Sequence, residues 1–228
     1  MSTAETSPSQ AWARLRAGNA RFAADAMEHP DLGAARRAEV AGGQHPFAVV
    51  LGCSDSRVPA EIVFDQGLGD LFVVRTAGHV LDGAVIGSVE FGVEVLGAPL
   101  VVVLGHEGCG ALRAATDALL TGSSAPGFVR EVVDRVIPSL VVDAAGPAGE
   151  VAAVGSAAAA RAAGRPRIEL PDDDELRRRH VLATVRLLHE RSGLLAAAVA
   201  EGRCAVVGLE YALTPGPAPL LGAVGAVD

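Results

Sequence analysis

Apolar residues occur in three short runs in the first half of the chain, each long enough for one buried strand. The runs cover residues 46–52, 71–75 and 99–105 and hold few polar side chains. Continuous apolar runs of this length are typical of strands in a parallel sheet that is covered on both faces. Between the second and third runs, residues 83–96 carry apolar side chains at helical spacing. This order predicts a right-handed crossover between parallel strands.

The rest of the chain predicts mainly helices. A first helix of about four turns begins near Ser9, because apolar residues including Trp12 and Leu15 fall on one stripe. We expect that stripe to pack against another surface, such as that of a partner subunit. Further helices are predicted within 110–120, from 128 to 136 with an end imposed by Pro138, from the acidic run 172–175 to 190, and from 194 to 201. Residues 204–211 predict a last strand, at the sheet edge.

These elements predict an α/β fold in a single domain that spans residues 1–228. We expect a central, mostly parallel sheet of about four parallel strands plus an edge strand, flanked by helices. Residues 1–30 form an N-terminal helical arm, and residues 215–228, rich in proline and glycine, predict an extended tail. Residues 143–167 are mostly small and lack large apolar anchors, which predicts a flexible insertion.

Composition and charge narrow the class of protein. Half of the 228 residues are apolar, and 27 acidic residues against 19 basic ones give a net charge of −8. An acidic chain of this kind is poorly suited to bind nucleic acid or an anionic membrane surface. The first ten residues show no secretory signal, and no apolar run approaches the length of a membrane helix. We therefore expect a cytoplasmic protein without a nucleic-acid or membrane partner.

Two cysteines and a histidine lie at the ends of the predicted strands. Cys53 follows the first run directly, and His106 and Cys109 follow the third. Carboxyl ends of parallel strands share one sheet edge, so these side chains should lie close together. Two thiolates and an imidazole suit Zn²⁺, and three protein ligands leave a fourth position for water. The alternative is that both cysteines are small buried side chains or form a disulfide; Cys204, inside an apolar run, is interpreted as structural.

Asp55 and Arg57 lie two residues apart, just after Cys53. In an extended turn their side chains can form a charge-assisted, bidentate pair that keeps Asp55 ionised. Asp55 could then accept a hydrogen bond from a zinc-bound hydroxide, or swing in as a fourth zinc ligand and close the site. A surface salt bridge without a role in chemistry is the alternative.

Four motifs resemble signatures of the β-class carbonic anhydrases. They are Cys-Ser-Asp-Ser-Arg-Val at 53–58, Phe-Asp-Gln-Gly-Leu-Gly-Asp at 64–70, Val-Val-Arg-Thr-Ala-Gly at 73–78 and Gly-His-Glu-Gly-Cys-Gly at 105–110. The resemblance runs from Trp12 to Leu140 and continues more weakly from His180 to Tyr211. Together the motifs are highly specific for that family, although none of them is specific alone.

The resemblance implies a zinc enzyme that hydrates carbon dioxide reversibly to bicarbonate and a proton, with zinc-bound hydroxide as the nucleophile. The implied zinc ligands are Cys53, His106 and Cys109. Asp55 and Arg57 would act as the catalytic dyad of the family. The resemblance also implies a homodimer or homotetramer in which the site lies at the dimer interface.

Substrate contacts are implied as well. The side chain of Gln44 and the backbone amide of Gly110 would donate hydrogen bonds to bound substrate. Three residues match positions that line the apolar cleft: Phe72, Ala77 and Phe91. Members with a separate inhibitory bicarbonate pocket carry Trp three residues before the first zinc cysteine, whereas this chain has Val50.

Other interpretations remain open at this point. The same metal and fold could hydrolyse a related heteroallene, such as carbon disulfide or carbonyl sulfide, or Asp55 could close a structural zinc site in a non-catalytic protein. Dinucleotide binding is disfavoured because no Gly-x-Gly-x-x-Gly follows the first strand.

The remaining histidines are assigned no chemistry. His45 and His79 could relay protons, but solvated or capping side chains are the preferred interpretation. His180 and His189 are nine residues apart on a predicted helix, which places them on nearly opposite faces, so they are interpreted as bystanders.

Overall fold

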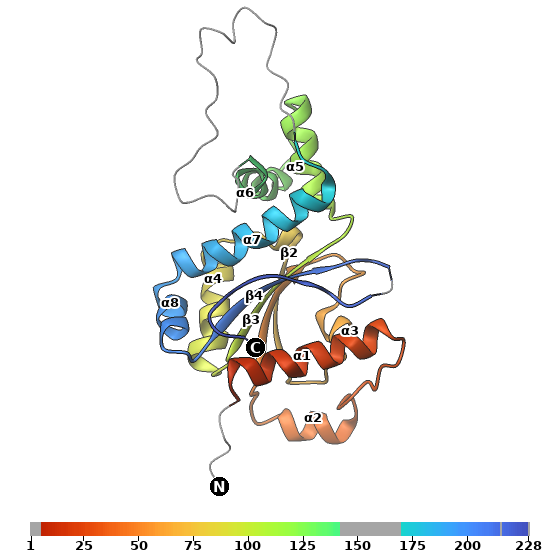
Figure 1. The fold of residues 1–228 in the computed structure, drawn as a ribbon, viewed down its shortest axis with the longest axis vertical. Helices are drawn as coiled ribbons and strands as arrows, with labels where there is room; N and C mark the ends of the chain where they lie inside the picture. The colour runs from red at the N-terminus through yellow and green to blue at the C-terminus, as the bar shows by residue number, and fades with distance from the viewer. Residues whose placement is uncertain (1–5, 142–169, 215, 228) are drawn as a thin grey trace, which may run out of the picture.

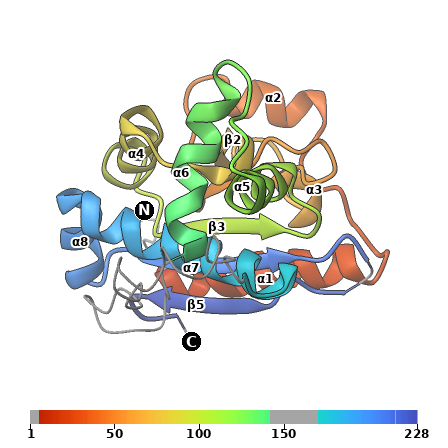
Figure 2. The same ribbon diagram turned by 90° about the horizontal axis from the view of Figure 1, so that it is seen from above.

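The computed structural model describes residues 6–141, 170–214 and 216–227, which form a five-stranded sheet with helices on both faces (Figures 1 and 2). The sheet order is β2-β1-β3-β4-β5. Its strands are β1 (Ala48–Cys53), β2 (Leu71–Thr76), β3 (Leu100–His106), β4 (Ala205–Tyr211) and β5 (Leu220–Val224). The first four are parallel, and β5 runs antiparallel to β4. The predicted fold class is therefore confirmed.

The prediction that residues 204–211 form the edge strand is wrong. β4 lies between β3 and β5, and nearly all of its residues are buried. The edge position belongs to β5, within the segment predicted as an extended tail. The prolines and glycines around β5 weaken its strand signal in the sequence, because neither residue favours a strand interior.

The helices confirm most of the predicted ranges. They are α1 (Pro8–Ala23), α2 (Ala34–Val40), α3 (Ala60–Val63), η1 (Ala77–His79), α4 (Gly83–Glu90), η2 (Phe91–Val95), α5 (Gly110–Thr121), α6 (Val129–Val141), α7 (Asp173–Arg191) and α8 (Gly193–Ala200). The predicted helix 83–96 changes from α to π geometry at Phe91. The predicted end at Pro138 is wrong, since α6 contains this proline and continues to Val141. A proline removes one backbone hydrogen bond, and the full burial of Leu140 stabilises the last turn.

The first helix packs on its own sheet rather than requiring a partner subunit. Its start is fixed by a capping box, in which Ser7 Oγ accepts from the Gln10 N–H and Gln10 Oε1 accepts from the Ser7 N–H. Trp12 and Leu15 are buried in the same cluster as Val102 of β3. Figure 2 shows α1 on one side of the sheet and α4 on the other.

Alternate residues of the strands supply two separate cores. On one face, strand residues pack with α1 and α3, and on the other face they pack with α4, α7 and α8. Val50 of β1 belongs to the first cluster, whereas Val49 and Leu51 belong to the second. A third cluster joins α5, α6 and the start of α7 over the carboxyl edge, and it includes Cys53 and Cys109. The carboxyl ends of β1 and β3 are thus covered by helices.

Helix α7 approaches the sheet closely because two strand residues have no side chain. A Cβ atom on Gly105 of β3 would lie 2.4 Å from Val181 Cγ2, and one on Gly208 of β4 would lie 2.8 Å from Val181 Cγ1. Val181 therefore occupies the space that larger residues on these strands would fill. This contact determines how near the neighbouring residues of α7 come to the carboxyl edge.

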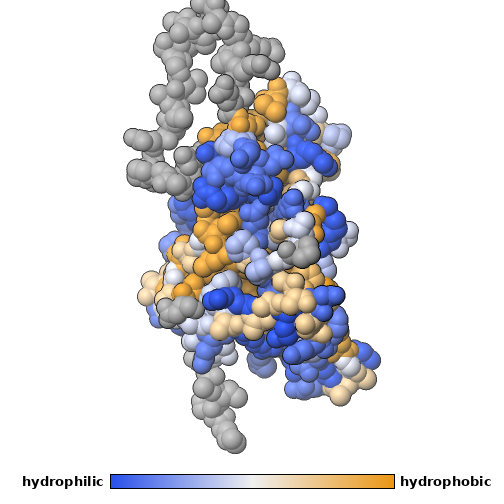
Figure 3. Space-filling model, turned by 45° about the vertical axis from the view of Figure 1, so that its right-hand side comes forward, coloured by the Kyte–Doolittle hydropathy of each residue, from blue (hydrophilic) through white to orange (hydrophobic). Residues whose placement is uncertain are grey.

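Within the described ranges, no helix combines the length and apolar character that crossing a membrane requires. The face shown in Figure 3 mixes hydrophilic residues with separate apolar patches. The predicted insertion at 143–167 lies outside the described residues, as do residues 1–5 of the predicted arm.

Candidate metal centre

Three potential metal ligands lie together at the carboxyl edge of the sheet. Cys53 is the last residue of β1, His106 is the last residue of β3, and Cys109 is the N-cap of α5. All three side chains are buried, and their ligand atoms lie within 4.8 Å of one another. The fold thus brings together the three residues that the strand pattern predicted to be neighbours.

The hydrogen bonds of His106 decide which ring nitrogen can bind a metal ion. Its Nδ1 lies 2.9 Å from the carbonyl oxygen of Glu107. A carbonyl only accepts, so Nδ1 carries the proton and Nε2 keeps its lone pair. Nε2 of His106 is the one buried side-chain nitrogen or oxygen in the described ranges that has no hydrogen-bond partner. An unsatisfied buried acceptor is costly, and a metal ion at Nε2 would remove that cost.

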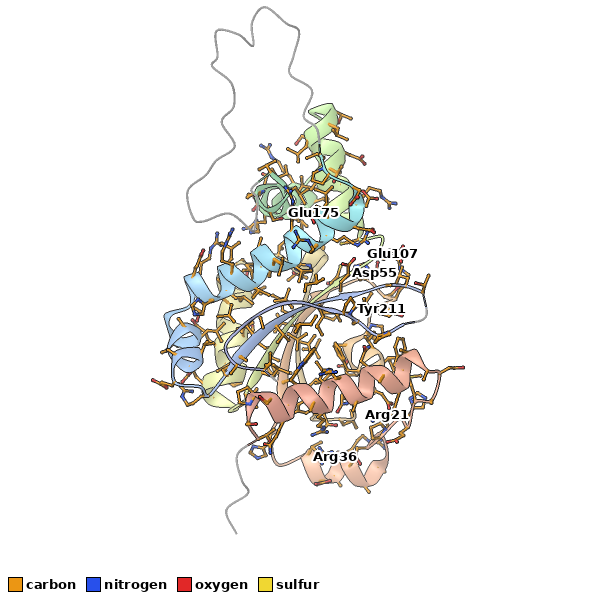
Figure 4. The ribbon with its side chains drawn as sticks, viewed as in Figure 1. Arg21, Arg36, Asp55, Glu107, Glu175 and Tyr211 are labelled. Carbon is orange, nitrogen blue, oxygen red and sulfur yellow. The ribbon has the colours of Figure 1, made fainter. Side chains whose placement is uncertain are left out.

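Strand β4 and the segment after it hold the turn that follows His106. The Glu107 N–H donates to the carbonyl of Tyr211 at 3.0 Å, and the Leu213 N–H donates to the Glu107 carboxylate at 3.2 Å. Figure 4 shows Glu107, Tyr211 and Asp55 in the same region of the molecule. The histidine is therefore positioned by a neighbouring strand as well as by its own.

The two thiols of the cluster strongly affect each other's ionisation. A hydrogen bond from Cys109, assisted by the Gly78 N–H, lowers the pKa of Cys53 to about 4 despite burial. The Gly78 nitrogen lies 3.3 Å from the Cys53 sulfur. The neighbouring Cys53 sulfur and burial both raise the pKa of Cys109. A second thiolate is thus unfavourable until a cation compensates its charge, and the donor set of two sulfurs and one nitrogen fits Zn²⁺.

Asp55 and Arg57 form the bidentate pair that their spacing predicted. Arg57 Nε donates to Asp55 Oδ1 at 2.9 Å, and Nη2 donates to Oδ2 at 2.7 Å. The backbone N–H of Arg57 also donates to Oδ1, at 2.9 Å. The guanidinium hydrogen bonds hold the pKa of the Asp55 carboxyl well below its usual range. In this arrangement Asp55 is bound to Arg57 and does not join the three ligands.

Arg75 has a positioning role that the sequence analysis missed. Its Nε donates to the carbonyl of Cys53 at 2.9 Å, and its Nη2 donates to the carbonyl of Asp55 at 2.6 Å. Arg75 lies on β2, which pairs with β1, so a neighbouring strand fixes the backbone that carries both side chains. The motif at 73–78 included Arg75, but nothing local indicates that its partners are backbone carbonyls.

The residues expected to contact substrate are only partly brought together within one chain. Gly110 begins α5 directly after Cys109 and is exposed. Phe72 and Phe91 are in contact, with ring centroids 6.0 Å apart, and Ala77 is exposed in the turn after β2. Gln44 is exposed and precedes β1, at the end of that strand opposite to Cys53.

Two histidines differ from their interpretation as solvated or bystander residues. His79 and His180 are nearly fully buried, and their rings stack with centroids 4.3 Å apart. Their side chains lie on different elements, η1 and α7, so the sequence spacing could not pair them. His180 makes hydrogen-bonding contacts with Ser139 Oγ and with the carbonyl of Gly78.

A cavity of ≈ 210 Å³ opens beside Cys109. Its walls come from the turn before α5, from α5 and from the start of α7, and they include Leu112 and Arg113. Ligand sites are usually concave and close to the residues that act on the ligand. The cavity leaves room for a small molecule next to the cluster.

Comparison with known proteins identifies the family. The carbonic anhydrase family model matches residues 48–218. The chain is 46% identical over 220 residues to carbonic anhydrase 2 of Mycobacterium tuberculosis, covering 96% of each chain. It is 47% identical over 225 residues to the carbonic anhydrase of Mycolicibacterium smegmatis, covering 97% of this chain and 98% of the relative.

Solved structures agree with the sequence relatives. The Coccomyxa β-carbonic anhydrase, solved in complex with acetazolamide, superposes with a TM-score of 0.61 at 25% identity, over 82% of this chain and 78% of that one. The Aspergillus fumigatus β-carbonic anhydrase CafA gives a TM-score of 0.58 at 25% identity, over 92% and 89%. By family match, full-length relatives and fold, the chain is an enzyme that belongs to the β class of the carbonic anhydrases.

Proposed function

We propose that this chain catalyses the reversible hydration of carbon dioxide to bicarbonate and a proton at a zinc ion held by Cys53, His106 and Cys109. The observation that carries the proposal is the unpartnered Nε2 of buried His106, a residue that lies with two buried cysteines in a cluster whose ligand atoms are within 4.8 Å of one another. A carboxylate bound by an arginine lies beside this cluster, on the turn that follows Cys53.

The donor set determines what the metal contributes. When bound by two thiolates and one imidazole, Zn²⁺ lowers the pKa of a coordinated water towards about 7 and so supplies a nucleophile at neutral pH. Cys53 and Cys109 provide the negative charge that retains the cation. His106 presents Nε2 because the Glu107 carbonyl holds the proton on Nδ1.

Asp55 and Arg57 orient the reacting groups. The ionised Asp55 carboxylate accepts a hydrogen bond from the attacking oxygen, which leaves a lone pair of that oxygen directed towards carbon dioxide. Arg57 keeps this carboxylate ionised and fixed through two side-chain hydrogen bonds. Since Asp55 is bound to Arg57, this arrangement supports a catalytic site rather than the closed structural site considered above.

Substrate binding involves both polar and apolar groups in this proposal. The Gly110 N–H lies in the first turn of α5, where backbone donors have no helical partner and can bind bicarbonate. Phe72, Ala77 and Phe91 would line an apolar cleft for carbon dioxide. Gln44 lies at the opposite end of β1 from Cys53, so it would reach a site only from a second copy of the chain.

That placement of Gln44 supports a homodimer or homotetramer with the site at a dimer interface. A β-carbonic anhydrase of Sordaria macrospora, 22% identical to this chain over 81% of its length, is described as tetrameric. We propose a cytoplasmic location on the sequence grounds given above. We also propose, from the acidic net charge, that the protein does not bind nucleic acid or membranes.

The test is stopped-flow hydration of carbon dioxide by the zinc-loaded protein between about pH 6.5 and 9, around the neutral pKa of a zinc-bound water. Asp55→Asn should lower kcat/KM by about 10²-fold or more. Glu201→Gln, an exposed control at the C-cap of α8, should not. Because the pKa of Asp55 is far below this window, the Asp55→Asn variant and the wild type should differ at every pH. One zinc per chain without turnover at any pH would contradict the proposal.

A further inference from the structure

A buried histidine outside the candidate ligand set is connected to the Cys53 sulfur through a single residue. His180 lies on α7, 3% exposed, and its Nε2 is 2.8 Å from the carbonyl oxygen of Gly78. The N–H of the same Gly78 donates to Cys53 Sγ at 3.3 Å. His180, Gly78 and Cys53 therefore form a continuous chain of hydrogen bonds that ends on a candidate metal ligand.

The proton on His180 can be assigned from its partners. A carbonyl oxygen accepts and cannot donate, so Nε2 must carry the hydrogen that faces Gly78. Burial lowers the pKa of His180, which favours a neutral ring with one N–H. The other nitrogen, Nδ1, lies 2.7 Å from Ser139 Oγ, and the single hydroxyl hydrogen of Ser139 also faces the carbonyl of Val136 at 2.6 Å. Ser139 on α6 and the stacked ring of His79 fix the plane of the imidazole.

The hydrogen bonds of Gly78 to His180 and Cys53 matter because a glycine backbone is otherwise free to rotate. It has φ 65° and ψ 24°, a left-handed conformation that glycine adopts readily and that other residues avoid. A Cβ at this position would also lie 2.7 Å from Ala111 Cβ. The site thus leaves no room for a side chain at residue 78. The glycine that it requires has large conformational freedom. Contacts on both sides of the Gly78 Cα restrict that freedom.

We propose that His180 is a positioning residue of the metal centre, which holds the Gly78 carbonyl and thereby aims the Gly78 N–H at the Cys53 sulfur. The inference rests on the proposed function, since it requires zinc on Cys53. An N–H···S hydrogen bond favours the thiolate, the form of cysteine that binds a metal ion, so its loss should weaken metal binding. It also draws electron density from the sulfur, so its loss should shift a thiolate-to-metal charge-transfer band. Partners of this kind typically change metal affinity or activity by about 10–100-fold when they are removed.

The experiment compares zinc affinity and the spectrum of the cobalt-substituted protein in matched variants. His180→Leu removes the donor while it keeps an apolar side chain in the buried site. It should raise the zinc dissociation constant, measured by chelator competition, by about 10–100-fold. The thiolate-to-cobalt charge-transfer band should shift with it. His180→Gln can place an N–H near the former Nε2 and should recover most of the affinity and the original band.

Controls separate positioning from a general loss of structure. His189→Leu, the same substitution on the same helix, should leave affinity and spectrum unchanged. If His180→Leu does not fold, Ser139→Ala carries the test, because it leaves the imidazole in place but removes the hydroxyl contact at Nδ1. It should give a smaller change in the same direction.

Three results would overturn the inference. Wild-type zinc affinity and an unchanged cobalt spectrum in folded His180→Leu would show that the contact does not act on the sulfur. If the leucine variant is unfolded, wild-type affinity and spectrum in Ser139→Ala would show the same. A folded His180→Gln as impaired as His180→Leu would exclude the hydrogen bond as the cause. A wild-type protein that does not bind zinc at all would instead overturn the proposed function.

Discussion

A methyl group added at Gly105 should destabilise the protein because Val181 already occupies the space. Gly105 directly precedes His106 on β3, and a Cβ there would lie 2.4 Å from Val181 Cγ2. Real Cβ contacts are essentially never that short, so α7 or the strand must move. Overpacking of a well-packed core costs about 1–3 kcal/mol, and we take about 2 kcal/mol for Gly105→Ala.

The chain offers a matched control for this substitution. Gly52 directly precedes Cys53 on β1, in the same position relative to a candidate ligand. A Cβ at Gly52 would meet only Leu104 Cβ, at 4.0 Å, an ordinary contact. Gly52→Ala should therefore change the free energy of unfolding by less than about 1 kcal/mol, and the small change could be stabilising, since alanine restricts the unfolded chain.

A double-mutant cycle tests the stated cause. Val181→Ala removes two buried methyl groups, each worth about 0.8 kcal/mol on transfer, plus a cavity term, for a loss of about 2 kcal/mol. If the effects were additive, the double variant would lose about 4 kcal/mol. Because the new methyl at residue 105 fills the space that Val181→Ala vacates, we expect a loss of only about 2 kcal/mol.

Urea unfolding at pH 7, followed by far-ultraviolet circular dichroism, measures the four free energies. A coupling of about 1–2 kcal/mol between the two sites would support the steric explanation. Additive losses would refute it, because they would show that Gly105→Ala acts without Val181. Equal losses for Gly52→Ala and Gly105→Ala would refute it as well, since the contacts of the two glycines differ.

Two further predictions concern charged groups that hold the loops around the sheet. The Asp65 carboxylate is fully buried; burial raises its pKa, but hydrogen bonds from Arg21 and two backbone N–H groups outweigh this and lower it. The ionised Asp65 carboxylate should therefore contribute fully to stability above its unfolded pKa of about 3.9, and this contribution should be lost as pH falls below that value. Asp65→Asn should then flatten the pH dependence of the urea midpoint between about pH 5 and 3. Arg75→Ala frees the carbonyls of Cys53 and Asp55 and should weaken zinc binding about tenfold in chelator competition; unchanged affinity would contradict this role.

Local pattern was enough to predict the ligands because Cys53 and His106 end their strands and Cys109 lies three residues after His106. The apolar runs fix the ends of β1 and β3, and the parallel arrangement places those ends at one edge. The spacing of Asp55 and Arg57 likewise predicts their ion pair, since both residues lie in one turn. These features need no knowledge of distant residues.

The residues around the ligands are positioned by contacts between distant parts of the chain, which sequence spacing does not predict. His180 is separated from Gly78 by 102 positions, and only the packing of α7 on the sheet brings them together. Arg75 looked like part of a motif, yet its guanidinium donates to the carbonyl of Cys53 at the end of the adjacent strand and to that of Asp55 in the turn after it. Pro138 shows the same limit, because the burial of Leu140 overrides a reliable local signal for a helix end.

Helix α7 connects the packing of the sheet to the chemistry of its edge. Val181, which rests on Gly105, is next in sequence to His180, which reaches Gly78. If α7 is the element that moves to admit a methyl group at residue 105, we expect the contact between His180 and Gly78 to lengthen. Gly105→Ala should then weaken zinc binding as well as stability, and Val181→Ala in the same chain should restore zinc binding towards the wild-type value. Recovery of stability without recovery of zinc affinity would separate the two roles of this helix and contradict the argument.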